Sequence, residues 1–229
     1  IDGAMWWNDA FESIGFIDAF QVKILPENVD PMDCRYNVIQ WVHRSTRGWS
    51  YGSSVTDPRT GEIIKGHVSL GSLRVRQDYL IGQSLIENPY LPQNKEKILE
   101  MSLARIRQLS AHEVGHTLGF AHNFSSSTKQ RSSVMDYPHP LIKIKDDKIN
   151  LDSAYAIGIG EWDKISVAYS YSEFKDNQNE KTELNKILEK SYEQGYRFIT
   201  DYDARAKGGA HVNAHLWDNS YHVTSGLDE

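Results

Sequence analysis

One short stretch of the chain has the residue types and the spacing to hold a catalytic metal ion. His112 and His116 lie four residues apart, so on a helix both imidazoles project from one face. Two neutral imidazoles at that spacing can share one zinc ion, with Zn–N distances of about 2.0–2.1 Å. Glu113 is offset around the helix axis, where its carboxylate can reach a metal-coordinated water without binding the metal. Gly119 lets the chain leave the helix sharply, and His122 can then turn back as the third ligand.

The number of ligands in this pattern is typical of catalytic zinc. Three protein ligands leave the fourth position of a tetrahedral ion to water, whereas structural sites are closed by four protein ligands. The alternative is a helix that carries surface histidines. That alternative explains neither the glutamate nor the helix-interior Gly115 and Gly119, each of which costs about 1 kcal/mol relative to alanine. The spacing therefore predicts a zinc hydrolase site.

The pattern resembles the elongated zinc motif of the metzincin metallopeptidases, and it reads His112-Glu-x-x-His116-x-x-Gly119-x-x-His122. Members of that clan have a methionine in a tight turn below the zinc site. The resemblance implies that Met135 is this Met-turn residue. Its thioether would then form an apolar floor under the histidines and would not be a ligand. An ordinary core methionine is the alternative.

A tyrosine follows two residues after this methionine. In some branches of the clan a tyrosine at that position contacts the zinc or the reacting carbonyl, and the resemblance extends this role to Tyr137. Its phenol could donate a hydrogen bond to the oxyanion that develops during hydrolysis. The alternative is a tyrosine that only packs in the turn.

The resemblance implies a zinc-dependent endopeptidase with Zn²⁺ as cofactor and a protein or peptide as substrate. The zinc would lower the pKa of its bound water to about 7. Glu113 would accept the water proton and deliver it to the leaving amine. Two other functions stay open: a catalytically silent, zinc-containing peptide-binding module, and a zinc hydrolase that acts on a non-peptide amide or ester.

Longer stretches resemble the catalytic domain of large bacterial zinc-dependent metalloproteases, which are usually exported. These stretches are Asp2–Glu12, Trp41–Trp49, Asp57–Ile63 and His122–Phe124. The resemblance implies that this chain is one catalytic domain, that flanking domains of a longer protein are missing, and that the protein acts in the periplasm, at the cell surface or outside the cell. Asn123 departs from branches that place an acidic residue after the third histidine.

Composition excludes several classes of protein. The 229 residues include 25 Lys and Arg against 31 Asp and Glu, which gives a net charge of −6 and argues against a nucleic-acid partner. No run approaches the roughly 18 apolar residues that a transmembrane helix requires. Cys34 has no partner for an internal disulfide, and we expect it to be a buried structural thiol.

Hydrophobic periodicity predicts an α+β fold in which the zinc motif ends the longest helix, Lys95–Phe120. Other helices are expected over Asp2–Gly15, over Arg76–Glu87, from Ile159 or Glu161 onward, and over Asn179–Gln194. The expected strands are Phe16–Leu25, an inner strand Tyr36–His43, and a hairpin that turns at Asp57–Gly61. The stretch Ser125–Ser133 is expected to be a polar loop.

The resemblance implies how these elements are arranged. Residues 1–122 would form an upper subdomain, a twisted mixed sheet with helices that ends in the zinc helix, and residues 123–229 would form a lower, mainly helical subdomain with the Met-turn. In the clan, an edge strand of the upper sheet pairs with the extended substrate. The candidate here is the run from His67 to Val75. Its substrate-binding residues would be His67, Val68, Ser69, Leu70 and Gly71. The alternative is an ordinary strand of the sheet.

The C-terminal region is rich in aspartate and histidine. Its potential metal ligands are Asp201, Asp203, His211, His215, Asp218 and His222. Their spacing matches no calcium loop, so we expect them to be solvated loop residues.

Overall fold

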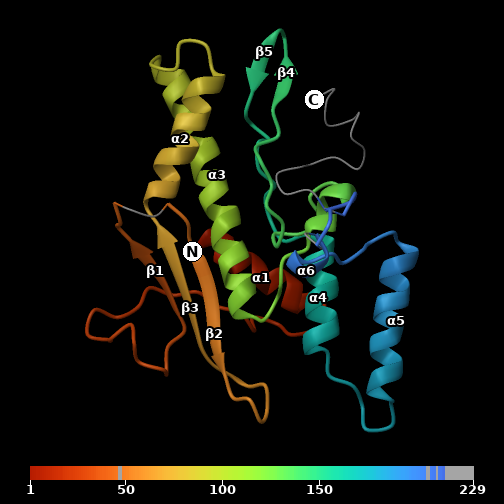
Figure 1. The fold of residues 1–229 in the computed structure, drawn as a ribbon. Coiled ribbons are helices and arrows are strands. Elements are labelled where there is room, and N and C mark those ends of the chain that lie inside the picture. The colour runs from red at the N-terminus through yellow and green to blue at the C-terminus, as the bar shows by residue number, and fades with distance from the viewer. Residues whose placement is uncertain (46–47, 205–206, 210, 215–229) are drawn as a thin grey trace.

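A long helix forms the centre of the molecule. The computed structural model describes residues 1–45, 48–204, 207–209 and 211–214. Helix α3, Pro92–Thr117, is the predicted long helix, with proline in its first turn, where no backbone N–H donor is needed (Figure 1). The helix ends at Thr117, and the chain turns away from it, as predicted, at Gly119, which has a φ of 93°. The amide of Phe120 donates to the carbonyl of Gly115 at 3.0 Å, a bond that closes the last turn.

A small mixed sheet lies against this helix. Strands β1 (Val38–Val42), β2 (Tyr51–Thr56) and β3 (Ile63–Gly71) are ordered β1-β3-β2, with β1 parallel and β2 antiparallel to β3. The predicted hairpin between β2 and β3 is confirmed, and its turn is closed by the Gly61 amide, which donates to the Asp57 carbonyl at 2.8 Å. The α+β fold class with a mixed sheet is therefore confirmed.

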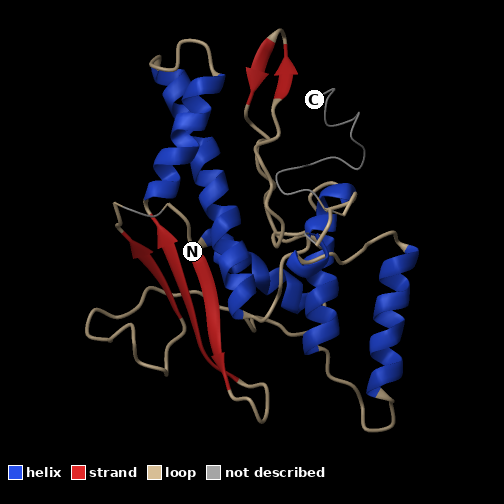
Figure 2. Ribbon diagram, viewed as in Figure 1, coloured by secondary structure: helices blue, strands red, loops and turns tan. Residues whose placement is uncertain are grey.

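The chain also forms further helices and a second hairpin (Figure 2). The helices are α1 (Asp2–Glu12), α2 (Leu73–Leu85), the 3-10 helix η1 (Phe124–Lys129), α4 (Glu161–Tyr171), α5 (Glu180–Glu193) and α6 (Asp201–Ala204). The hairpin consists of β4 (Lys143–Lys145) and β5 (Lys148–Asn150). The predicted polar loop at 125–133 is partly wrong, because η1 covers its first part and buries several of its serines. Within the described residues, no helix has both the length and the apolarity to cross a bilayer.

Two of the strand predictions are wrong. Strand β1 was expected to be an inner strand, but it is an edge, and Ile39 and Trp41 are 36% and 44% exposed. The described residues 16–25 form no strand, because no other strand pairs with them. Residues 19–25 and β1 instead line a cavity of about 770 Å³. The apolar residues on both faces of β1 therefore reflect this cavity and not a flanking strand.

The predicted substrate strand is the central strand of the sheet. In β3, the backbone from His67 to Ser69 is paired with β1 on one side and with β2 on the other. Leu70 and Gly71 continue the pairing with β1, and the Val68 and Leu70 side chains belong to the hydrophobic core. A central strand offers no free edge to an extended substrate, so the prediction of an edge strand at His67–Gly71 is wrong and the alternative, an ordinary strand of the sheet, is confirmed.

The N-terminal helix is fastened directly to α3. Trp7 is fully buried, and its indole N–H donates to the Ala111 carbonyl at 2.8 Å. Its ring stacks on Phe120, with 5.2 Å between the ring centroids. A Cβ on Gly3 would lie 1.9 Å from the Arg107 carbonyl oxygen, so only glycine allows the two helices to approach this closely. Helix α1 therefore supports the end of α3 that carries the histidines.

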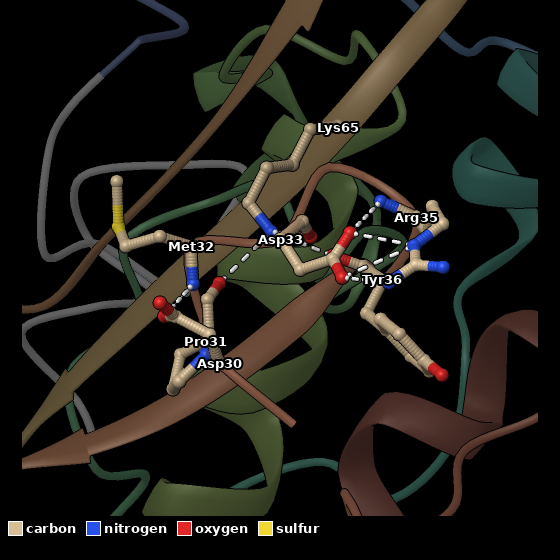
Figure 3. A network of polar contacts seen from close by, with 7 residues as sticks. All are labelled: Asp30, Pro31, Met32, Asp33, Arg35, Tyr36 and Lys65. Atoms are coloured by element: carbon tan, nitrogen blue, oxygen red, sulfur yellow. Dashed lines mark hydrogen bonds and ion pairs between the residues drawn. The ribbon is translucent and has the colours of Figure 1, made fainter. Parts of the chain in front are cut away.

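A lysine in β3 holds the loop that precedes β1. The Lys65 ammonium donates to three main-chain carbonyls, those of Pro31 and Asp33 at 3.0 Å and that of Tyr36 at 2.6 Å (Figure 3). Cys34 lies within this loop and is exposed, so the expectation of a buried thiol is wrong. The lysine supplies donors to carbonyls that have no sheet partner, and so it fixes the approach to β1.

We predict that Lys65→Met lowers the free energy of unfolding by about 1–3 kcal/mol, because it removes the ammonium that bridges the three carbonyls. Urea denaturation followed by circular dichroism measures the change. Lys148→Met, at an exposed position of β5, is the control and should change stability little. Equal stability of the two variants would contradict the role of Lys65.

Candidate metal centre

The three histidines of the motif converge at the end of α3. His116 Nε2 lies 3.2 Å from His112 Nε2 and 3.1 Å from His122 Nε2. One ring nitrogen from each residue lies within 4.8 Å of the other two. Two rings come from one helix face, and the turn at Gly119 brings the third ring back toward them. The sequence prediction that these three side chains meet is therefore confirmed.

Each helical histidine is oriented by a hydrogen bond at Nδ1, the ring nitrogen that faces away from the cluster. His112 Nδ1 lies 2.7 Å from the carbonyl oxygen of Val134, and His116 Nδ1 lies 2.8 Å from that of Phe120. Because a carbonyl oxygen only accepts, each Nδ1 must carry the proton and donate it. The lone pair is then on Nε2, which faces the centre of the cluster.

The third histidine has a carboxylate behind it. His122 Nδ1 lies 2.7 Å from Oδ2 of Asp201, a residue 79 positions further along the chain. Asp201 opens the short helix α6 and bonds to His122, so its prediction as a loop residue is wrong, although its side chain is exposed as expected. His215, Asp218 and His222, from the same predicted group, lie outside the described residues.

The donor set and its geometry fit zinc. For Zn–N bonds of 2.0–2.1 Å, tetrahedral coordination requires about 3.3 Å between the ligand nitrogens. The two separations that involve His116 are close to this value, at 3.1 and 3.2 Å, and all three ligand nitrogens lie within 4.8 Å of one another. Burial lowers the pKa of His112 and of His116, so both imidazoles are neutral at physiological pH. A neutral imidazole is the form that binds a metal.

The glutamate of the motif is buried beneath strand β2. Burial raises the pKa of Glu113 to about 7, while a hydrogen bond from the Gly52 main-chain N–H favours the ionised form. A Cβ on Gly52 would lie 1.9 Å from the main-chain oxygen of Glu113, so the strand lies directly on the helix at this point. Strand β2 is thus the edge of the sheet that adjoins the metal centre.

Met135 packs against α3 between the two helical histidines. It is 1% exposed, and a Cβ on Gly115 would lie 2.3 Å from its sulfur and 2.7 Å from the ring of Trp7. The glycine that would be unfavourable in an isolated helix therefore makes room for the methionine and the tryptophan. Met135 is therefore buried against the helix turn that carries His112 and His116.

A buried carboxylate from α4 holds the turn around this methionine. Oδ1 of Asp163 accepts from the Ser133 hydroxyl at 2.5 Å, and Oδ2 accepts from the amides of Val134 at 2.9 Å and Gly160 at 2.8 Å. The same serine oxygen accepts from the Met135 amide at 2.9 Å. Burial raises the pKa of Asp163 to about 7, although these hydrogen bonds favour the ionised form.

Tyr137 lies beside the histidines. Its ring centroid is 4.5 Å from that of His122, 5.2 Å from that of His112 and 5.9 Å from that of Phe124. The tyrosine is thus brought to the centre by ring packing, as both interpretations of the sequence require.

Comparison with known proteins agrees with this geometry. The profile of a family described as Met-zincin matches residues 94–227. The chain belongs to the Met-zincin family. The matched region contains the three histidines, Glu113 and Met135, and membership implies a function of the zinc metallopeptidase type. No curated protein and no solved structure matches the chain.

Sequence reasoning missed the supporting residues of this Met-zincin. Nothing in the local sequence distinguishes Asp163 from other helix-starting aspartates, and the contact of Gly52 depends on how the sheet packs. Asp201 had one signal, because it is among the potential metal ligands of the C-terminal region. Its contact with His122, 79 positions earlier in the chain, could not be read from spacing.

We predict that Asp163→Ala lowers the free energy of unfolding by about 3 kcal/mol or more, because two buried donors and one partly buried donor lose their acceptor. Asp163→Asn keeps one acceptor oxygen and should cost about 1–2 kcal/mol. Chemical denaturation of the variants measures both, with the exposed Asp176→Ala as control. If Asp163→Ala is as stable as this control, the carboxylate does not hold the turn.

Proposed function

We propose that this Met-zincin is a zinc-dependent endopeptidase. The observation that carries the proposal is the convergence of three imidazole Nε2 atoms beside a buried glutamate of the same helix. His112, His116 and His122 would hold the zinc ion. The hydrogen bonds behind the rings support this role, because they fix the tautomer that a metal requires.

Each nearby side chain has a part in the proposed hydrolysis. When bound, zinc activates water at neutral pH and polarises a carbonyl as a Lewis acid. Glu113 would act as general base and then as general acid, and a carboxyl with a pKa of about 7 is suited to both roles. Tyr137 would donate a hydrogen bond to the oxyanion, since its ring already lies against His112 and His122.

Strand β2 is the proposed substrate-binding edge in place of β3. Its outer edge has no strand partner among the described residues, and Gly52 lies on the helix at Glu113. An extended peptide that pairs with this edge would lie along the metal centre. The other edge, β1, borders the cavity at Val114 and Leu118 and so lies on the opposite side of α3. The wider resemblance to exported bacterial metalloproteases supports protein or peptide substrates outside the cytoplasm.

We predict that Glu113→Gln keeps bound zinc and loses nearly all proteolysis, because the amide cannot accept a proton. Elemental analysis measures the zinc, and a quenched-peptide assay measures the cleavage. Glu100→Gln, at an exposed position of the same helix, is the matched control and should retain activity. Full activity of Glu113→Gln would remove this mechanism.

The same preparation distinguishes the alternative functions. A peptidase cleaves a mixture of denatured proteins, and a chelator stops the cleavage. A silent binding module would hold zinc and cleave nothing. A hydrolase of non-peptide amides or esters would leave the protein mixture intact while it turns over small substrates.

Hydrogen exchange tests the proposed edge. In Glu113→Gln bound to an uncleaved substrate peptide, we predict that amides of β2 that are not bonded to β3 become at least severalfold slower to exchange. Amides on the outer edge of β1 serve as the internal control and should not change. Protection of β1 with none in β2 would place the substrate on the other edge.

A further inference from the structure

We propose that Asp201 is a positioning residue of the metal centre, one that orients His122 and holds its metal-binding tautomer. The inference rests on the proposed zinc function. It names a residue outside the zinc motif, 79 positions beyond the third histidine.

The three histidines differ in how they are held. The acceptors for His112 and His116 are main-chain carbonyls at the Met-turn and at the end of α3. His122 follows the helix on an extended turn, and its Nδ1 meets a side-chain carboxylate at 2.7 Å. A carboxylate is a stronger acceptor than a carbonyl, so it both fixes the proton on Nδ1 and makes Nε2 a better donor to a metal.

The neighbouring Asn123 explains how a distant carboxylate reaches this position. Its amide nitrogen donates to the Arg197 carbonyl at 2.9 Å, and its amide oxygen accepts from the Ile199 amide at 3.1 Å. The Phe124 amide in turn donates to the Ile199 carbonyl at 2.9 Å. These bonds lay residues 197–199 alongside the third histidine, and Asp201 follows directly.

Asn123 is also 1% exposed, and its role requires an amide. A carboxylate at this position would have no proton to donate to the Arg197 carbonyl. An acidic residue after the third histidine would therefore lose the hydrogen bond to Arg197 that helps to bring Asp201 to His122. Asn123 thus positions the chain, and Asp201 supplies the acceptor for His122.

An apolar cluster supports the same arrangement. Phe124, Ile199, Ala204 and Ala214 are buried together, with Tyr137 packed against them. Ile199 and Ala204 bracket Asp201, so the backbone around the carboxylate is anchored on both sides. The Asp201 side chain itself is 57% exposed, while that of His122 is 15% exposed. Replacing Asp201 therefore alters a hydrogen bond without opening the core.

The experiment measures zinc affinity, without substrate, by competition with a chromophoric chelator. We expect Asp201→Ala to weaken zinc binding about 10–100-fold, and Asp201→Asn, which keeps a neutral acceptor, to weaken it less. Cobalt substitution gives a second readout, because a reoriented His122 changes the visible d–d absorption. Asp203→Asn removes the same charge from the same short helix and should bind zinc like the parent protein.

Circular dichroism checks that each variant folds. If Asp201→Ala does not fold, Asp201→Glu is measured in its place, and because it keeps the charge it should retain part of the zinc affinity. If the parent binds zinc and all Asp201 variants bind it within twofold, with an unchanged cobalt spectrum, the inference is wrong and the proposed function stands. An equal loss of zinc affinity in Asp203→Asn would also overturn the inference, since the loss would then come from the negative charge of the helix and not from the contact with His122. If the parent binds no zinc, both proposals fail.

Discussion

Three imidazole lone pairs must point at one place, and this requirement shapes the rest of the structure. Neutral nitrogens about 3 Å apart repel one another unless a cation lies among them, so each ring must be held from behind. The three acceptors come from the Met-turn carbonyl of Val134, the helix-end carbonyl of Phe120 and the carboxylate of Asp201. The metal centre is thus a junction of three chain segments that α3 alone could not build.

Three other parts of the chain approach α3 so closely that only glycine fits at each contact. Helix α1 touches it at Gly3, strand β2 touches it at Gly52, and the Met-turn methionine touches it at Gly115. A fourth glycine, Gly160, lets the start of α4 approach the Met-turn at Ser132. At each position a Cβ would lie at most 2.3 Å from a neighbouring atom, so larger residues would push these segments away from the histidines.

Local sequence patterns predicted where helices and turns lie better than they predicted which strands lie side by side. The period of α3 and the turn at Gly119 were readable, because helix spacing and a left-handed exit depend on nearby residues. The position of strands in the sheet was not. Apolar residues on both faces of β1 suggested an inner strand, yet it is an edge, and β3 is central although the family resemblance implied an edge strand there. Alternation reports burial of a face and says nothing about which strand supplies the hydrogen bonds.

The sequence by itself determined the donor set: two histidines on one helix face, a glutamate beside them, and a glycine that returns a third histidine. Those features follow from helix geometry and the conformational freedom of glycine, so they are fixed by spacing. Only the tertiary structure decided which groups hold the rings and which edge borders them. Asp163, Asp201 and Gly52 act across long separations in sequence, and such contacts depend on packing that no local pattern encodes.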